Sequence, residues 1–408
     1  MVVCFFICTF AVEFKFDLKM RKYIISIALC CCSLTSCIKD EAPNKECDIE
    51  SVWIEGEEYQ QYFYQTNEMR KESIGSIDTD IIFSVRSLIS LNKQIPLNFK
   101  ITEGATIEPA NGSKQDFTKG PVTYTVTAED GQWKRTYNVI FREAALPASK
   151  YSFENVETRR ERTMFYQYND IHYFYEKASD GKPDYCWATG NPGTALLMKD
   201  AKPESFPTYS VAEGKEGKGV CLNTQSAGAM GEAFNKPIAA GSLFLGKFVT
   251  EYVMADPLKA TQFGVPNGRE PVRITGWYKY KPGEKFTDMH MKEIPNRVDE
   301  ASIYAVFYRN TDDAGNTYVL DGHSVEDLDK ILDNPLVYKV ARVKSLPATD
   351  TWTQWEMFFE GKDAPDDIVN AMGCNLALVF SSSKSGAQFE GAIGSTLYID
   401  EVEVSYEK

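Results

Sequence analysis

The sequence predicts an all-β protein in which an N-terminal β-sandwich is followed by a larger β-jelly-roll domain. Strict alternation of apolar and polar residues predicts strands with one buried face, as in Val122–Thr127 and Val272–Tyr280. Turn residues such as the Asp130-Gly131 pair separate these segments at short intervals. Helical periodicity is rare along the chain. This combination is typical of sandwiches and jelly rolls.

The chain opens with an export signal. A basic pair follows Met20, and the apolar stretch after it ends at Leu34, which makes it too short to span a bilayer as a helix. Leu34-Thr35-Ser36-Cys37 resembles a bacterial lipobox, whose cysteine is acylated and becomes the first residue after cleavage. We therefore expect residues 1–36 to be a leader and signal peptide with Met20 as the true start, and Cys37 to be lipidated. The alternatives are one long signal, or an ordinary signal peptide with a coincidental cysteine.

The residues after Cys37 predict a location. Ile38-Lys39-Asp40-Glu41 resembles the surface-export signal of Bacteroidetes lipoproteins, which implies a lipid-anchored protein on the outward side of the outer membrane. A plain charged tether is the alternative. Residues 37–47 are mostly polar and include Pro43, so we expect them to form a flexible lipidated tether.

Charge and cysteine content narrow the range of partners. The chain has a net charge of −14, and because four of its 44 basic and two of its 58 acidic residues precede Cys37, the remainder has a net charge of −16. Such a surface disfavours nucleic acid and anionic lipid and is compatible with neutral ligands and Ca²⁺. The later cysteines lack the CxxC spacing of a zinc site, and both one disulfide and buried free thiols fit them. These are Cys47, Cys186, Cys221 and Cys374.

Residues 48–143 are expected to form the first sandwich. Strands are predicted over Ile81–Val85, Ile95–Ile101, Val122–Thr127 and Trp133–Phe141. The stretch from Ala105 through Phe141 resembles the immunoglobulin-like modules of Bacteroidetes surface proteins, which implies an Ig-like β-sandwich that acts as a spacer; ligand binding is the alternative. Residues 144–150 are small and contain a proline, so we expect them to form the linker.

Residues 151–408 are expected to form the jelly roll. Ser302–Tyr308 and Leu376–Phe380 are apolar runs typical of strands that are buried on both faces. The final strand, Leu397–Tyr406, changes its apolar phase at Asp400-Glu401, which predicts a β-bulge there. One short helix is predicted over Val325–Leu332, after a serine that could cap it.

Several motifs of this second domain occur in a characteristic order. Tyr151-Ser152-Phe153-Glu154 opens it, Trp187–Gly193 follows a long loop, Gly276–Gly283 lies in the middle, and Phe389–Val402 closes it. Together these motifs resemble the PCMD family of Bacteroidetes, which is named for carbohydrate metabolism, over essentially all of residues 150–408. The resemblance implies a β-jelly roll similar to carbohydrate-binding modules, and it leaves the activity open.

A first candidate sugar site lies around Trp187. A sugar ring stacks on flat aromatic faces while its hydroxyls pair with planar polar groups. Trp187, with Tyr185 beside it and Asn191 after it, lies in a stretch rich in glycine and proline, where an exposed ring could stack on a sugar. The alternative is a tryptophan that plugs the end of the sandwich.

A second candidate lies on the strand Val272–Tyr280. Trp277 shares a strand face with Arg273 and Lys279, whereas Ile274 and its alternating neighbours face the core. This arrangement predicts a ligand surface or, as the alternative, an exposed ring that is covered by cations. Arg269, in the loop before the strand, is a further ligand-binding candidate.

Metal and catalytic candidates rest on single carboxylates. Glu154 and Asp400 lie near the first and last strands, where jelly-roll binding modules often hold a structural calcium; hydrogen bonding to neighbouring loops is the alternative. Glycoside hydrolysis needs two carboxylates facing one cleft. Glu390 is the most suggestive single acid, with a buried structural glutamate as the alternative, and no catalytic motif singles out a pair.

The leading hypothesis is therefore a non-catalytic surface lipoprotein that binds a glycan or polysaccharide through its jelly roll, beside neighbouring surface glycan-uptake proteins. A glycoside hydrolase or other carbohydrate-active enzyme in the same fold is the first alternative. A protein-binding adhesion or structural protein is the second.

Overall fold

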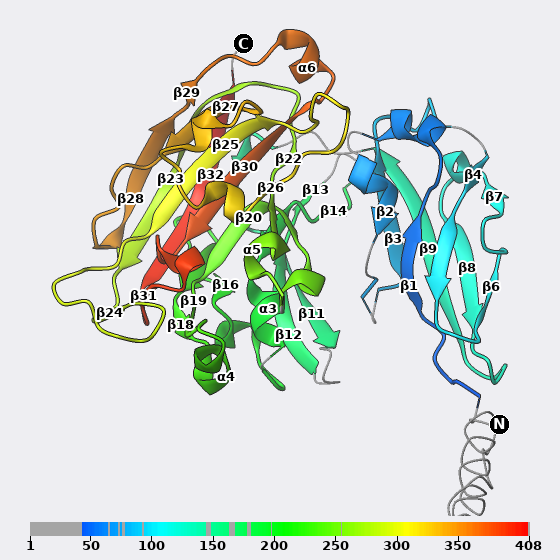
Figure 1. Ribbon diagram of the computed structural model, residues 1–408, viewed down its shortest axis with the longest axis horizontal. Helices are drawn as coiled ribbons and strands as arrows, with labels where there is room; N and C mark the ends of the chain where they lie inside the picture. The colour runs from blue at the N-terminus through cyan, green and yellow to red at the C-terminus, as the bar shows by residue number, and fades with distance from the viewer. Residues whose placement is uncertain are drawn as a thin grey trace, which may run out of the picture.

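The computed structural model confirms the all-β class. It describes residues 43–63, 66–71, 74–75, 78–91, 94–143, 148–162, 168–177, 181–196, 198–253 and 255–406. The leader with Met20, the lipidation candidate Cys37 and the 38–41 motif lie outside the described residues. Figure 1 shows two β-rich bodies side by side, the first in blue to cyan and the second in green to red. Over the described ranges, no helix is long and apolar enough to cross a membrane.

The first domain is a sandwich of short strands around an apolar core. One sheet has the order β2-β1-β5 and another has the order β3-β9-β8-β6, in which β3 and β9 run parallel. Between them lie buried aromatic side chains, including Phe83, Tyr124 and Phe141. The bounds are β1 Ile49–Trp53, β2 Arg70–Lys71, β3 Asp80–Val85, β4 Ile95–Pro96, β5 Asn98–Ile101, β6 Thr106–Glu108, β7 Lys114–Gln115, β8 Val122–Thr127 and β9 Lys134–Glu143, with 3-10 turns η1 Glu57–Tyr62, η2 Thr66–Met69 and η3 Phe117–Lys119.

The second domain is built from two larger sheets. The six-stranded sheet has the order β16-β17-β32-β23-β28, with β10 beside β32. Its strands are β10 Lys150–Tyr151, β16 Thr208–Val211, β17 Gly219–Asn223, β23 Pro271–Lys281, β28 Thr349–Phe358 and β32 Thr396–Tyr406. The nine-stranded sheet has the order β26-β21-β20-β30-β25-β27-β29, with β15 beside β20 and β22 beside β30. Its strands are β15 Trp187–Thr189, β20 Ser242–Phe248, β21 Thr261–Phe263, β22 Val265–Pro266, β25 Ser302–Arg309, β26 Leu320–Asp321, β27 Val337–Arg342, β29 Glu360–Gly361 and β30 Cys374–Ser381.

Hairpins and short helices connect these sheets. The two-stranded pairs are β11 Val156–Arg162 with β12 Tyr168–Phe174, β13 Glu176–Lys177 with β14 Pro183–Asp184, β18 Gln225–Ser226 with β19 Ile238–Ala239, and β24 Phe286–Thr287 with β31 Gly391–Ala392. The helices are α3 Asn191–Ala195, α4 Gly228–Ala233, α5 Pro257–Ala260 and α6 Asp366–Asn370, with 3-10 turns η4 Pro203–Ser205, η5 Thr250–Tyr252, η6 His323–Val325, η7 Ile331–Asp333 and η8 Gly386–Gln388.

Alternation along β23 decides how the two sheets pack. Ile274, Tyr278 and Tyr280 are buried in the core that the sheets share, as the sequence predicts. Gly276 lies on the same inward face, and a Cβ atom there would come within 2.6 Å of the Trp355 ring. The glycine therefore makes room for a buried tryptophan from the neighbouring strand β28.

Two further expectations about local structure have clear outcomes. The bulge predicted in β32 is confirmed, because two residues of β32 lie between the partners of Thr275 and Trp277 where β23 has one residue, and Glu401 has a φ of 49°. The helix predicted over Val325–Leu332 is wrong. Ser324 binds back to Asp321 instead of capping a helix, and the segment forms the two separate 3-10 turns η6 and η7.

The four cysteines beyond Cys37 are free thiols: Cys47, Cys186, Cys221 and Cys374. Burial raises the pKa of the Cys374 thiol to about 12. Such a thiol stays protonated and packs as a small apolar side chain.

Candidate functional site

A large cavity lies on the nine-stranded sheet, on the face turned away from the shared core; we call it the groove. It has a volume of about 910 Å³. Phe244, Phe263, Tyr304 and Val379 lie at its floor and belong to an apolar cluster separate from the core between the sheets. Binding sites for small molecules are typically concave and largely apolar, with a few placed polar groups.

Strand register arranges the floor in two rows. Phe244, Val379, Tyr304 and Arg342 are cross-strand neighbours on β20, β30, β25 and β27. Two residues further along the same strands, Ser242, Ser381 and Ser302 form the second row. Residues two apart on a strand share a face, so a row that holds two aromatic rings lies beside a row of hydroxyls.

Tyr304 adds a hydroxyl to the first of these rows. The side chain is only 8% exposed, and burial raises the pKa of its hydroxyl further above the usual value. The hydroxyl therefore stays protonated and can both donate and accept a hydrogen bond. Arg342, the next member of the row, forms an ion pair with Asp329 at the rim.

Four segments border the groove, namely 253–258, 322–329, 227–240 and 384–389. Phe234 follows α4 on this border and is 60% exposed. Most of this apolar ring is therefore exposed to solvent. It is therefore available to stack on a ligand in the groove.

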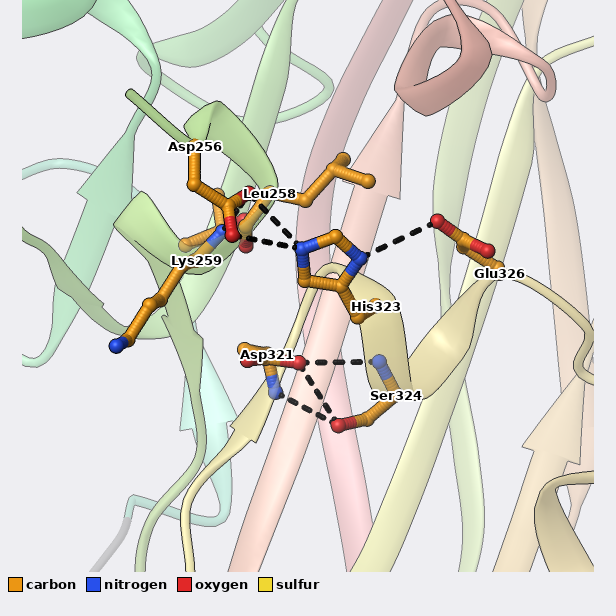
Figure 2. A network of polar contacts seen from close by, with 8 residues as sticks. Asp256, Leu258, Lys259, Asp321, His323, Ser324 and Glu326 are labelled. Carbon is orange, nitrogen blue, oxygen red and sulfur yellow. Dashed lines mark hydrogen bonds and ion pairs between the residues drawn. The ribbon is translucent and has the colours of Figure 1, made fainter. Parts of the chain in front are cut away.

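A histidine clasp joins two of the border segments (Figure 2). The Nε2 atom of His323 lies 2.9 Å from a carboxylate oxygen of Asp256, and its Nδ1 atom lies 3.5 Å from Glu326. The hydrogen bond to Asp256, with the charges of Asp256, Asp321 and Glu326, raises the pKa of His323 above its usual value. Gly322 adds a backbone bond to Leu258 of 2.9 Å, so the contact does not depend on charge alone.

Every carboxylate that lines the groove has a cationic neighbour. Glu300 pairs with Lys384 at 3.6 Å, Asp327 with Lys330 at 2.7 Å, and Asp329 with Arg342. Glu326 faces His323. A general acid for glycoside hydrolysis must hold its proton near neutral pH, and at Asp327 the hydrogen bond from Lys330 acts against this by lowering the pKa of the carboxyl.

The first candidate sugar site is inside the domain. Trp187 is 4% exposed, donates from Nε1 to Glu176 at 3.3 Å and contacts Tyr151, Phe153 and Phe380. Asn191 is fully buried and bridges the backbone N–H and C=O of Thr208. These placements match a tryptophan that fills the sandwich and leave no exposed Trp187 face for stacking.

Tyr185 lies apart from them, at a smaller cavity between the two domains. Its hydroxyl donates to Glu157, and the Arg159 guanidinium covers its ring at 4.1 Å from the centroid. This interdomain cavity has a volume of about 300 Å³. Contacts of Arg142 with Pro183 at 2.9 Å and with Asp184 at 3.6 Å hold the domains together beside it.

The second candidate site is on the outer side of the six-stranded sheet, opposite the groove. Trp277, Arg273 and Lys279 share that face as predicted and are half-buried. Arg273 pairs with Glu356 at 3.1 Å. Arg269 is exposed but lies at the end of the sheet, where it covers the Tyr406 ring at 4.0 Å. The structure thus brings three of these four residues together.

The calcium candidates meet at one turn. The Asp400 carboxylate accepts from the backbone N–H groups of Lys215 at 2.7 Å and Glu216 at 3.0 Å, and Glu154 accepts from Lys218 at 2.8 Å. Hydrogen bonding to a neighbouring loop therefore occupies both side chains. Within the described ranges, no group of three or more His, Cys, Asp or Glu side chains is placed to hold a metal ion. Calcium binding stays a prediction.

Glu390 does not line the groove. It is half-buried and pairs with Arg297 at 3.3 Å, and Arg297 also binds Ser385 at 3.0 Å. The buried carboxylate of that region is Asp299, which accepts from Ser383, Ser395 and Ala392 at 2.6–2.8 Å. It fixes the loop that carries the 384–389 border.

Sequence reasoning missed the groove residues because they lie in nearly continuous apolar runs. Phe244, Tyr304 and Val379 are flanked by apolar neighbours, so periodicity gives no inner or outer face. Two features of the sequence could have indicated the groove. Each run begins or ends with a serine, and Phe234 stands alone among small and polar residues.

The fold defines an all-β protein whose second domain packs two sheets around one core. The chain belongs to the family described as "Putative carbohydrate metabolism domain", whose model matches residues 152–405. Residues 63–140 match a second family model, "SGBP, N-terminal". The comparison with curated proteins gave no match.

Two crystal structures from Bacteroides are similar to the chain. One is described as a "putative glycoside hydrolase" from Bacteroides thetaiotaomicron, with 34% identity over 91% of this chain and 99% of that chain, at a TM-score of 0.71. The other has the same description and comes from Bacteroides vulgatus, with 34% identity over 64% of this chain and 99% of that one, at a TM-score of 0.58.

Proposed function

We propose that the protein is an outer-membrane surface lipoprotein that binds a glycan or polysaccharide in the groove of its second domain. The observation that carries this proposal is the exposed Phe234 ring at the border of a floor that bears a row of serine hydroxyls. The ring offers C–H stacking, and the hydroxyls offer hydrogen bonds to one ligand. Sugars expose both kinds of group along each ring.

The family matches support the same class of ligand. The second domain belongs to a carbohydrate-related family, and the first matches the N-terminal domain model named SGBP. A lipid at Cys37 would hold the chain to the membrane, and the first domain would act as a spacer. Surface proteins that take up glycans are then natural neighbours.

The test compares two exposed aromatic residues, one at the groove and one in the first domain. The whole chain is titrated with a panel of neutral polysaccharides in affinity gels and by calorimetry. We expect Phe234→Ala to weaken binding about tenfold, or about 1.4 kcal/mol, through loss of one stacking ring. Trp133→Ala is the matched control, because Trp133 is 58% exposed and lies in the first domain.

Tyr304→Phe sharpens the test, since it keeps the ring and removes one hydroxyl from the floor. We expect a smaller loss of affinity and an unchanged fold, because no protein group bonds to this hydroxyl within the described ranges. A panel without any binder would contradict the proposal. So would a binder whose affinity is the same in wild type, Phe234→Ala and Tyr304→Phe.

Glycoside hydrolysis is the second candidate function, because both similar crystal structures carry that description. It would need a carboxyl that holds a proton, and the groove carboxylates have cationic neighbours. Reducing-end release from the same panel separates the two functions. Release by wild type that is abolished in Glu300→Gln or Asp329→Asn would establish hydrolysis at the groove.

A further inference from the structure

Three aromatic rings lie together on the outer side of the six-stranded sheet, on three adjacent strands. Tyr398 is on β32, Trp277 is on β23, and Trp352 is on β28. Lys279 pairs across the strands with Tyr398, and Trp277 pairs with Gln354, two residues from Trp352. Neighbouring strands are about 4.8 Å apart, so the rings of β32 and β28 span roughly 10 Å of open sheet surface. We call these rings the platform.

Two lysines cover the platform. The Nζ atom of Lys279 lies 4.8 Å from the centroids of both Trp352 and Tyr398. The Nζ atom of Lys215 lies 4.7 Å from the centroid of Trp277. Lys215 comes from the turn that Asp400 holds by two backbone hydrogen bonds, so its position over the ring is built into the fold.

The charges of these lysines are not balanced locally. Neither has a carboxylate partner within ion-pair distance over the part of the chain that the structure describes, whereas Arg273 on the same strand face is paired with Glu356. The chain as a whole has a net charge of −14, so two uncompensated cations over aromatic rings are a local exception. A cation over an aromatic face is held weakly, by roughly 0.5–1 kcal/mol at an exposed site, and a better anionic partner can draw it away.

We propose that the platform with Lys215 and Lys279 is a second carbohydrate site, specific for acidic polysaccharides that carry uronic carboxylates. The sugar ring stacks on the indole or phenol face that a lysine covers in the free protein. The displaced ammonium group moves aside and pairs with the sugar carboxylate. The two charges and the stacking faces thus recognise one ligand unit. Of the acids on this face, Glu356 is already paired with Arg273.

This site is separate from the groove. The core between the two sheets lies between them, with Ile274, Tyr278 and Leu378 buried inside it. The proposal therefore does not rest on the groove binding any sugar. A flat face with covered rings could also meet a protein, and the ligand series below separates that occupant from a polysaccharide.

The probes are polygalacturonic acid and its methyl-esterified form, which share one backbone and differ in the carboxylate charge. Calorimetry with the whole chain should show binding of the acid form, at least tenfold weaker binding of the ester, and a weaker affinity at high salt because surface charge pairs are screened. No binding of polygalacturonic acid, or equal binding of both forms, would overturn the proposal.

Three variants locate the site. Lys279→Met keeps the apolar stem and removes the charge, and Trp352→Ala removes one ring; each should weaken binding of the acid form about tenfold. Phe358→Ala is the matched control, because this ring is on the same face and 57% exposed but its covering cation, Arg273, is already paired. Loss of binding in Phe358→Ala, or in the groove variant Phe234→Ala, would place the acid elsewhere and contradict the platform. If Trp352→Ala lowers the melting temperature, Lys279→Met still tests the site, because it removes the charge and keeps the apolar stem.

Discussion

The second domain has two outward faces that differ in how they are built. The groove floor is buried apolar surface: Phe244 is fully covered, and Tyr304 nearly so. On the opposite face, half-buried rings lie beneath movable lysine side chains. Groove residues therefore belong both to the proposed ligand site and to the packed interior of the fold, whereas platform residues contribute little to the fold. Variants of groove residues should therefore change both ligand binding and stability, whereas variants of platform residues should change ligand binding with little loss of stability.

Truncating one ring on each face is the strongest test of this difference between the faces. Phe244→Ala should destabilise the domain by about 3–5 kcal/mol, because it empties a fully buried site. Trp277→Ala should cost about 1–2 kcal/mol, since the ring is half-exposed and loses one cation contact. Chemical denaturation followed by near-ultraviolet circular dichroism measures both. Equal losses would show that the platform is part of the core after all.

The same contrast explains what the sequence could predict. Strands of the six-stranded sheet alternate, so the inward Ile274 and the outward Trp277 and Lys279 are assigned correctly from the pattern. Strands of the nine-stranded sheet are apolar on both faces because border segments cover the outer one, and the pattern predicts the strands but not the groove. The sequence leaves the burial of Trp187 and Asn191 open for a related reason: Trp187 is on the short strand β15, which is buried by long-range pairing with β20, and Asn191 begins the helix that follows.

On each face a titratable side chain holds two segments together, Asp400 on the platform side and His323 on the groove side, and the two side chains differ in burial. Asp400 is buried and holds the turn with Lys215, and burial raises the pKa of its carboxyl to about 6 against the opposing effect of three backbone N–H groups. His323 is half-exposed at the groove border, and its raised pKa comes first from the hydrogen bond to Asp256. Both groups bind a proton more tightly in the folded state. Both therefore stabilise the fold at low pH and lose that effect as pH rises.

The second largest effect is expected at Asp400. Because its pKa is about 6 in the fold and its ordinary value is 3.8, the folded state binds more protons between these values. The contribution of Asp400 to stability should thus fall by about 2 kcal/mol between about pH 4.5 and pH 7.5. Asp400→Asn cannot titrate, so its melting temperature relative to wild type should rise over this window. Parallel pH profiles of the two proteins would contradict the shifted carboxyl.

Quenching of Trp277 fluorescence tests whether the bonds that Asp400 accepts from the turn keep Lys215 over the platform. Lys215 and Glu216 both donate to the Oδ2 atom of Asp400, and Glu401 donates to its Oδ1 atom. An asparagine amide has a single oxygen and cannot accept all three bonds, so the turn should loosen and Lys215 should leave the Trp277 ring more often. Trp277 fluorescence should then become more accessible to a neutral quencher such as acrylamide. Lys215→Ala is the control, because it removes the side chain that covers the ring and keeps the backbone N–H that Asp400 binds. Quenching that rises in the control but not in Asp400→Asn would separate the turn from the platform.

The smallest effect is expected at His323, on the groove side. The ring is half-exposed, and exposed ion pairs contribute only about 0.2–1 kcal/mol, so the charge of His323 should add at most a few tenths of a kcal/mol. Since its folded pKa is raised, this contribution is present below the usual histidine value and is lost as pH rises through the folded value. His323→Gln should remove that slope while Gly322 and Leu258 still hold the two border segments together through their backbone bond. Melting curves of wild type and His323→Gln at about pH 5.5 and pH 8.5 measure the difference. A pH effect as large as that of Asp400 would mean that the histidine clasp, and not the backbone bond, holds the groove border, and the contrast between the two faces would then have to be abandoned.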